Sequence, residues 1–218
     1  TPGPAPQSQA ETFEYDGTDY TDTGNMNTDR YGLSGCGTQT AGLAWAGRTV
    51  APDNDPGSIN VHTEEYDGSS WTESGNLSTG RLEGGGFGVQ TAAVYAAGRS
   101  MPGGAGAYAL TEEYNGSTWS SGENFPEVRT YHQAAGTLTA GIVFGGQGGS
   151  PLATRTTTFT YDGTDYAASA ALGTGRYSGT GSGGTQAAAL LSGGYTSDHV
   201  ATTEEFGSAI VLKTVTDS

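Results

Sequence analysis

The sequence predicts an all-β fold, a propeller of four blades with four antiparallel strands in each blade. Three observations predict it. A unit of 45 to 51 residues recurs along the chain, an Asp-Gly or Asn-Gly step divides its first half, and its second half is rich in glycine and alanine. Four short strands in a repeat of this length make one propeller blade.

The repeat is anchored on an aromatic residue at Tyr15, Tyr66, Tyr114, Tyr161 and, in a degenerate copy, Phe206. A threonine stands three residues before every anchor. Five residues after the anchor stands a Tyr or Trp in the first four copies and Val211 in the fifth. Ten residues further on, the first four copies carry an arginine. Offsets that recur in this way indicate a repeat protein.

The first half of each unit is predicted to be a β-hairpin. The run from the threonine to the anchor and the run through the following Tyr or Trp are short and β-prone, and YDG or YNG stands between them. Asp or Asn followed by Gly tolerates the positive φ angles of a type I′ turn.

The second half is predicted to be the inner strand pair, with the sequences AGLAWAG, AAVYAAG, AGIVFGG and AAALLSGG in its second strand. Small side chains suit strands that crowd around an axis. The length of the unit varies mainly after the glycine that closes this strand, in residues 48–61, 99–110, 147–157 and 195–202. We expect these loops to form one face and to carry any partner contact.

The ends of the chain raise the question of ring closure. Residues 1–10 are Pro-rich and polar, which indicates a linker or arm, and residues 11–218 are predicted to form the single propeller domain. The first outer hairpin precedes any inner strand, so the N-terminus is predicted to join the last blade and close the ring. The alternative is a five-bladed or open array that a neighbouring chain completes.

The order of arginine, double glycine, tyrosine, tryptophan and arginine resembles the kelch repeat. The wording TEEYDGSSWTESGNLSTGR is similar to the kelch-like repeats of virion proteins from tailed bacteriophages. The resemblance covers residues 11–218 and implies a kelch-type β-propeller. The double glycine is intact at Gly145–Gly146 and Gly193–Gly194 and is reduced to Ala-Gly at Gly47 and Gly98.

The resemblance also implies that the repeat arginine lies near the mouth of the propeller, where it can bind acidic partners. The candidate binding residues are therefore Arg30, Arg81, Arg129 and Arg176. The alternative is that each arginine pairs with an acidic side chain or stacks on an aromatic ring. The acidic pairs, such as Glu64–Glu65, are expected to form a solvated edge. The tyrosine and tryptophan columns are expected to pack between blades.

Charge and composition exclude several function classes. A formal charge of −15 argues against nucleic acid and anionic membrane surfaces. Cys36 is the only cysteine, and His62, His132 and His199 have no ligand spacing, so no metal site or other cofactor is expected. No catalytic constellation stands out, so the chain is predicted not to be an enzyme. No apolar run is long enough for a membrane helix.

The sequence thus favours a phage virion structural protein, at the tail, in a fibre or as a decoration of the capsid surface, that acts as an interaction or receptor-binding scaffold. The expected partners are other virion proteins and a host surface glycan or protein, within a symmetric oligomer on the virion surface or tail, outside the cell. A secreted glycan-binding adhesin is the alternative, and a propeller enzyme is a third hypothesis.

Overall fold

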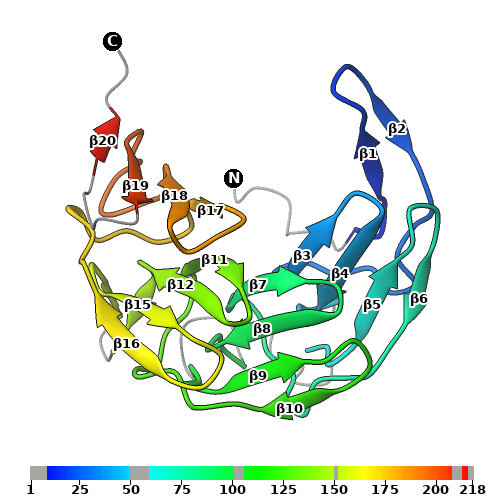
Figure 1. The fold of residues 1–218 in the computed structure, drawn as a ribbon, viewed down its shortest axis with the longest axis horizontal. Helices are drawn as coiled ribbons and strands as arrows, with labels where there is room; N and C mark the ends of the chain where they lie inside the picture. The colour runs from blue at the N-terminus through cyan, green and yellow to red at the C-terminus, as the bar shows by residue number, and fades with distance from the viewer. Residues whose placement is uncertain (1–8, 50–58, 101–105, 150–151, 208–212, 216–218) are drawn as a thin grey trace, which may run out of the picture.

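The structure, a computed structural model, describes residues 9–49, 59–100, 106–149, 152–207 and 213–215. Every regular element within these residues is a β-strand. Four antiparallel sheets of four strands each are arranged as a four-bladed β-propeller (Figure 1), which confirms the predicted fold class.

Each blade begins just after a repeat arginine and follows the chain outwards, from the strand nearest the axis to the strand at the rim. The first blade contains β3 (Ser34–Thr38), β4 (Ala41–Trp45), β5 (Thr63–Tyr66) and β6 (Trp71–Glu73). The second contains β7 (Gly85–Val89), β8 (Ala92–Ala96), β9 (Thr111–Tyr114) and β10 (Trp119–Ser121). The third contains β11 (Gln133–Thr137), β12 (Ala140–Phe144), β15 (Thr158–Tyr161) and β16 (Tyr166–Ser169). The fourth contains β17 (Thr180–Ser182), β18 (Ala188–Ser192), β19 (Thr203–Gly207) and β20 (Lys213–Val215).

Two further hairpins lie outside these sheets. They are β1 (Phe13–Tyr15) with β2 (Tyr20–Asp22), and β13 (Gln147–Gly148) with β14 (Ala153–Thr154). The predicted closure of the ring by the N-terminus is wrong. β1 pairs only with β2, and β20 occupies the rim of the last blade, so that blade has no place for an N-terminal strand. An opening separates the β1–β2 hairpin from β19 and β20 (Figure 1).

The predicted arm at residues 1–10 lies outside the described residues except for its end. Gln9 and Arg30 bridge through their backbones, and the Ala10 carbonyl accepts a hydrogen bond from the Met26 N–H over 2.9 Å. The last outer pair was predicted at residues 203–211. β19 confirms its first strand, whereas the second begins later, at Lys213. Val211 lies outside the described residues.

The outer hairpins are confirmed, but their turn is not the predicted two-residue type. Tyr15 pairs with Tyr20, which leaves four residues in the loop. The Asp16 carboxylate accepts hydrogen bonds from the backbone N–H groups of Thr18 and Asp19, over 2.7 and 2.9 Å. These bonds hold an Asx-type loop and lower the pKa of Asp16. Asp67, Asn115 and Asp162 make the same bonds in the other copies.

The core consists of apolar clusters between neighbouring blades. Leu43 and Trp45 of the first blade pack against Tyr95 and Tyr114 of the second, and the second and third seams are built alike. The anchor tyrosines of the first three blades are at most 4% exposed, which confirms their predicted burial. The tryptophans of the outer strands are only partly buried. The predicted burial is wrong for Tyr15 and Tyr20, which are 50% and 73% exposed because no blade lies on that side of the β1–β2 hairpin among the described residues.

Candidate binding face at the axial mouth

The four repeat arginines are buried inside the blades and do not line an open mouth. Each is at most 2% exposed. Three of them pair with the first glutamate of the third strand in the blade that follows: Arg30 with Glu64, Arg81 with Glu112 and Arg176 with Glu204. This placement does not support the predicted binding role of Arg30, Arg81, Arg129 and Arg176. It matches the alternative, an architectural pairing.

The first of these pairs shows how the arginine is held. The Nη1 group of Arg30 donates hydrogen bonds to the His62 carbonyl over 2.8 Å and to the Ala46 carbonyl over 3.3 Å. The Glu64 carboxylate also accepts a hydrogen bond from the Asn27 N–H over 2.6 Å. Burial lowers the pKa of Arg30, and the charge of Glu64 opposes that shift. The pair therefore ties the loop before the blade to two of its strands.

The third blade solves the same problem with different residues. Phe159 stands where the other blades have the paired glutamate, and the Arg129 guanidinium lies 5.4 Å from its ring centroid. Arg129 instead donates to Glu127 over 2.7 Å. The residue whose N–H would need the missing carboxylate is Pro126, which has no N–H. The three differences fit together. Phe159 supplies no carboxylate, Glu127 pairs with Arg129 in its place, and Pro126 has no N–H that would need a carboxylate acceptor.

The acidic pairs do not form the expected solvated edge. Glu64, Glu112 and Glu204, the first member of each pair, are at most 4% exposed. Of the second members, Glu65 accepts a hydrogen bond from the Tyr114 hydroxyl of the next blade. Burial and then this bond raise the pKa of Tyr114 to about 12. Adjacent residues of a strand face opposite sides of the sheet. The first glutamate therefore pairs with the arginine of its own blade, and Glu65, a second glutamate, accepts a hydrogen bond from the neighbouring blade.

The backbone two residues after each repeat arginine forms a chain of contacts around one end of the axis. Gly32, Glu83, Tyr131 and Ser178 all have φ between +52° and +64°. The Glu83 N–H donates to the Gly32 carbonyl over 3.0 Å, Tyr131 to Glu83 over 2.9 Å and Ser178 to Tyr131 over 3.0 Å. Non-glycine residues adopt this conformation at a cost, and such strain is concentrated at functional sites.

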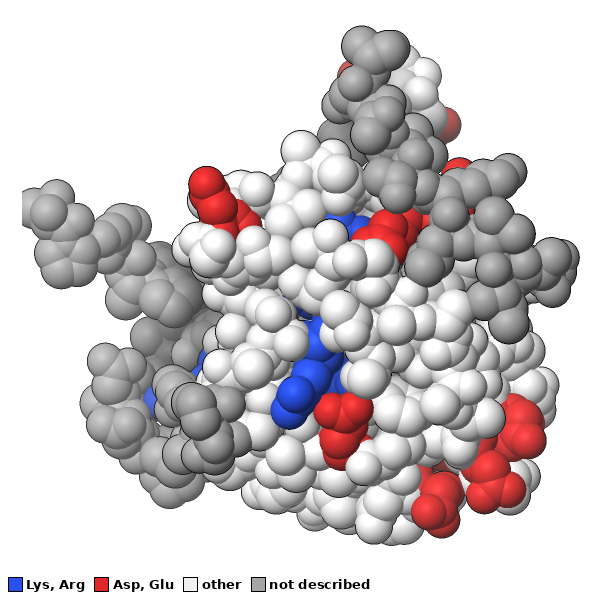
Figure 2. All heavy atoms as spheres, turned by 90° about the vertical axis from the view of Figure 1, so that its left-hand side faces the viewer, with Lys and Arg blue, Asp and Glu red and all other residues white. Residues whose placement is uncertain are grey.

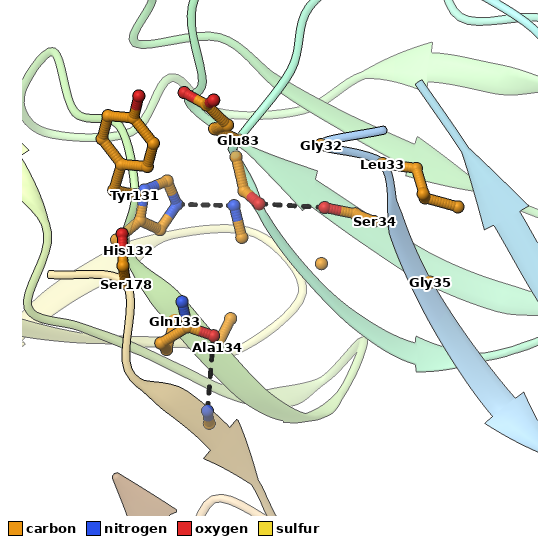
Figure 3. Close-up of a pocket in the computed structure, with 14 residues that line it drawn as sticks. Gly32, Leu33, Ser34, Gly35, Glu83, Tyr131, His132, Gln133, Ala134 and Ser178 are labelled. Atoms are coloured by element: carbon orange, nitrogen blue, oxygen red, sulfur yellow. Dashed lines mark hydrogen bonds between the residues drawn. The ribbon is translucent and has the colours of Figure 1, made fainter. Parts of the chain in front are cut away.

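This chain borders a hollow of about 320 Å³ at the start of the inner strands (Figure 3). Ser34, Glu83, Tyr131 and Ser178 contribute polar groups to its lining, and Gly84–Gly86 leave one wall without side chains. Figure 3 shows Glu83 and Tyr131 together on one rim, with Ser34 on another strand. The hollow is a small, mostly polar site at the mouth of the propeller.

His132 lines the hollow, and its side chain is held by contacts within the fold. It is 2% exposed, and its ring stacks on Phe125 with centroids 5.7 Å apart. Its Nε2 atom accepts a hydrogen bond from the Gly85 N–H of the preceding blade over 2.8 Å. Burial and then the charge of Arg129 lower the pKa of His132 to about 3. The imidazole is therefore neutral near pH 7 and links two blades.

Arg99 neutralises the charge at the mouth. Its Nη2 donates to Glu83 over 2.7 Å and also to the Tyr131 hydroxyl, and its guanidinium lies 4.8 Å from the Tyr131 ring centroid. Burial alone would lower the pKa of Arg99, but the hydrogen bonds and charge of Glu83 raise it. Arg99 and Glu83 of the second blade and Tyr131 of the third blade therefore form one bonded group.

A row of polar aromatic side chains extends from this group over the last blade. The centroids of Tyr131 and Tyr177 are 5.9 Å apart, those of Tyr177 and Tyr195 are 5.4 Å apart, and His199 follows at 5.4 Å. The three tyrosines are half-buried and His199 is exposed. Rings of this kind offer rigid contact area together with hydrogen-bonding groups. We call Tyr131, Tyr177, Tyr195 and His199 the mouth row.

The variable loops share this end of the molecule, as predicted. Each follows the second strand of its blade, and the residue that opens it bridges the segment just after the repeat arginine: Arg48 with Tyr31, Arg99 with Leu82, Gln147 with Thr130, Tyr195 with Tyr177. Parts of three of these loops, residues 50–58, 101–105 and 150–151, lie outside the described residues. Whether this face carries a partner contact stays a prediction.

The described residues form no metal-binding cluster, and the face drawn in Figure 2 carries no large patch of one charge. No group of three or more His, Cys, Asp or Glu side chains in the described part of the chain is placed to hold a metal ion. Cys36 lies in β3, where burial raises the pKa of its thiol to about 12. On the side shown in Figure 2, basic groups are few and acidic groups are scattered. The described residues contain no helix that is long and apolar enough to span a membrane.

Sequence reasoning missed the residues of the mouth. Glu83 and Tyr131 stand two residues after the repeat arginine, and Tyr177 stands one residue after it. Arg99 and Tyr195 directly follow the glycine that closes the inner strand, and His199 lies four residues beyond Tyr195. Two residues after the arginine, all four side chains differ while the positive φ is kept. The positions directly after the arginine and directly after the glycine vary less, because Tyr31 and Tyr177 are alike and so are Arg48 and Arg99. A comparison of the copies for differences, rather than for identities, would have found them.

Comparison with known proteins supports the fold alone. No family model matches the chain, and no curated protein matches it either. The chain is similar to a solved structure of YjhT, a bacterial protein, with a TM-score of 0.71 and 12% sequence identity over 91% of this chain and 72% of that one. The β-propeller scaffold is thus shown by its own strands and by this likeness.

Proposed function

We propose that this protein is a non-catalytic binding scaffold whose mouth row holds a neutral glycan, and that it serves as a structural protein of a tailed-phage virion, at the tail or on the particle surface. The observation that carries the binding proposal is a contrast between two kinds of repeat position, buried positions that recur and mouth positions that vary. Within the four blades, the repeat arginines and the anchor aromatic residues are at most 7% exposed, whereas most mouth positions differ between copies and present polar groups.

The chemistry of the mouth favours a sugar over a charged or strongly apolar ligand. Tyr177 and Tyr195 expose part of their rings beside hydroxyl and backbone groups, which suits stacking combined with hydrogen bonding. The opposite charges of Glu83 and Arg99 neutralise each other in an ion pair. A chain with a formal charge of −15 repels anionic polymers at a distance. These features together favour a neutral glycan.

The virion role rests on the resemblance of the repeats to kelch-like repeats of phage virion proteins. A stiff, acidic scaffold with a variable loop face suits a particle component that acts through contacts. The partners proposed are other virion proteins and a host surface glycan.

A glycan array tests the binding proposal. We expect the wild-type chain to bind a set of neutral oligosaccharides, and Tyr177→Ala and Tyr195→Ala each to reduce binding at least about tenfold. Val89→Ala is the control, because Val89 is 45% exposed at the end of β7, outside both the mouth row and the β1–β2 hairpin. Binding that survives both mouth substitutions, or the absence of any bound glycan, would contradict the proposal.

A second experiment tests the virion role. Antibodies against the chain should label purified, intact particles in electron micrographs. Purified particles that lack the chain would refute this part of the proposal, and its recovery from the culture medium would then favour the secreted adhesin.

A further inference from the structure

Three of the four junctions between adjacent units of this protein share one recurring pair of hydrogen bonds, which we call the seam pair. The anchor tyrosine of a blade donates its hydroxyl proton to a glutamate of the preceding unit: Tyr66 to Glu14, Tyr114 to Glu65 and Tyr161 to Glu113. The outer aromatic side chain bonds to a threonine of the preceding unit: Trp71 to Thr12 over 2.8 Å, Trp119 to Thr63 over 2.8 Å and Tyr166 to Thr111 over 3.0 Å. Each of these three seams therefore has a donor face and an acceptor face, whereas the anchor of the last blade, Phe206, has no hydroxyl to donate.

The β1–β2 hairpin belongs to this series. Its Thr12 and Glu14 accept the seam pair from the first blade, so it occupies the place of the outer half of a preceding blade. Its own donor residues are Tyr15 and Tyr20, whose rings contact each other at a tilt of 36° with centroids 4.8 Å apart. They are 50% and 73% exposed. The donor face of the hairpin is therefore present, and no blade among the described residues covers it.

The last blade has the opposite unfilled face. Its acceptor residues are Thr203 and Glu205 on β19. The Thr203 hydroxyl shares a hydrogen bond with the Ser192 hydroxyl over 3.0 Å, and a hydroxyl oxygen can accept a second one. No hydrogen bond or ion pair joins the Glu205 carboxylate to another side chain that the structure describes, and Lys213 stands opposite Glu205 in the strand register. Leu190 pairs with Glu205 in the strand register and is only half-buried. The residues that take its place in the first three blades are covered by the next blade and are at most 2% exposed: Leu43, Val94 and Ile142.

We infer that the Tyr15–Tyr20 face of one copy docks on the Thr203–Glu205 face of a second copy. In this contact the Tyr15 hydroxyl donates to the Glu205 carboxylate, the Tyr20 hydroxyl pairs with Thr203, and the two rings cover Leu190. The recurring seams supply the geometry, since three of them join the same residue types in the same order.

The two faces belong to different copies because they do not meet within one chain. Figure 1 shows the hairpin and the last blade on opposite sides of the opening. A contact between two different faces of identical chains is head-to-tail, and it builds rings or open rows of copies. The contact is independent of the mouth row, so it can fail or succeed whatever the mouth binds.

Analytical ultracentrifugation of the full chain tests this inference. We expect association that rises with protein concentration, and Tyr15→Phe or Glu205→Gln to weaken it by about tenfold or more. Tyr195→Ala in the mouth row should leave association unchanged. Tyr15 and Tyr20 are exposed, so the chain should keep its circular dichroism spectrum when both are replaced.

Mixing two variants distinguishes a head-to-tail contact from any other. Tyr15→Ala with Tyr20→Ala blocks the donor face, and Glu205→Arg blocks the acceptor face, so each variant alone should be monomeric. Their mixture should form a heterodimer and nothing larger, because one intact face remains on each chain. A wild-type chain that stays monomeric at all concentrations, or variants that associate as the wild type does, would overturn the inference.

Discussion

Replacement of Glu112 by Phe tests the claim that the repeat arginines hold the blades together. Arg81 is fully buried and Glu112 is 2% exposed. Removal of one partner from a buried ion pair costs about 3–5 kcal/mol, because the other charge is left uncompensated. The Ser78 N–H, which donates to Glu112 over 2.8 Å, loses its acceptor as well. At about 2–4 °C per kcal/mol for a chain of this size, Tm should fall by roughly 6–20 °C.

The third blade shows how the same substitution can be tolerated. It has Phe159 at this position and Glu127 two residues before its arginine, where the second blade has Thr79. We therefore expect Thr79→Glu to return about 2 kcal/mol or more of the stability lost in Glu112→Phe, and to add little to the wild type. Thermal and urea unfolding followed by circular dichroism give the four free energies of this double-mutant cycle.

Glu123→Gln serves as the control, since Glu123 is exposed. If Glu112→Phe unfolds at the same temperature as this control, the buried pair does not stabilise the blade. If Thr79→Glu returns none of the lost stability, the account of the third blade is wrong.

Three further predictions use the same unfolding assays. Gly86→Ala should cost about 1–3 kcal/mol, because its new Cβ would lie 2.5 Å from the ring of Trp45, and a stability equal to the wild type would show that the ring moves away freely. Thr158→Val should be neutral or stabilising because the Thr158 hydroxyl is buried without a partner, whereas Thr63→Val should cost about 1–2 kcal/mol because Thr63 accepts an indole N–H. The pKa of His132 is lowered to about 3 in the folded chain, so the unfolded chain binds the proton first and stability should fall by about 1.4 kcal/mol per pH unit as the pH drops from about 6.5 towards 3. His132→Gln should flatten that slope, and an unchanged slope would show that other groups cause it.

The sequence was sufficient for the architecture because the repeat made each position visible several times. The offsets of threonine, anchor and arginine located every blade, and the inner strands lie where the small residues stand. The hairpin turns were located correctly, but their type was wrong. A single sequence does not show that the Asp16 side chain, rather than a pair of left-handed residues, closes the loop.

The sites were harder to predict for a physical reason. Recurrence marks residues that every blade needs for its own structure. Such residues, for example Arg81 and Glu112, are buried and paired with each other, so they do not face a ligand. Residues that are free to bind differ between copies, so they carry no repeated signal. The sequence also could not show that adjacent glutamates would be divided between two blades, because that division depends on how the sheets stack.

The most direct test of the account is to observe the tyrosine rings of the mouth row by nuclear magnetic resonance while a neutral oligosaccharide from the array is titrated. The account predicts that the ring resonances of Tyr131, Tyr177 and Tyr195 shift together and saturate, while those of Tyr15 and Tyr20 stay in place. Shifts confined to the β1–β2 hairpin, or a bound glycan that moves no resonance of the mouth row, would contradict it.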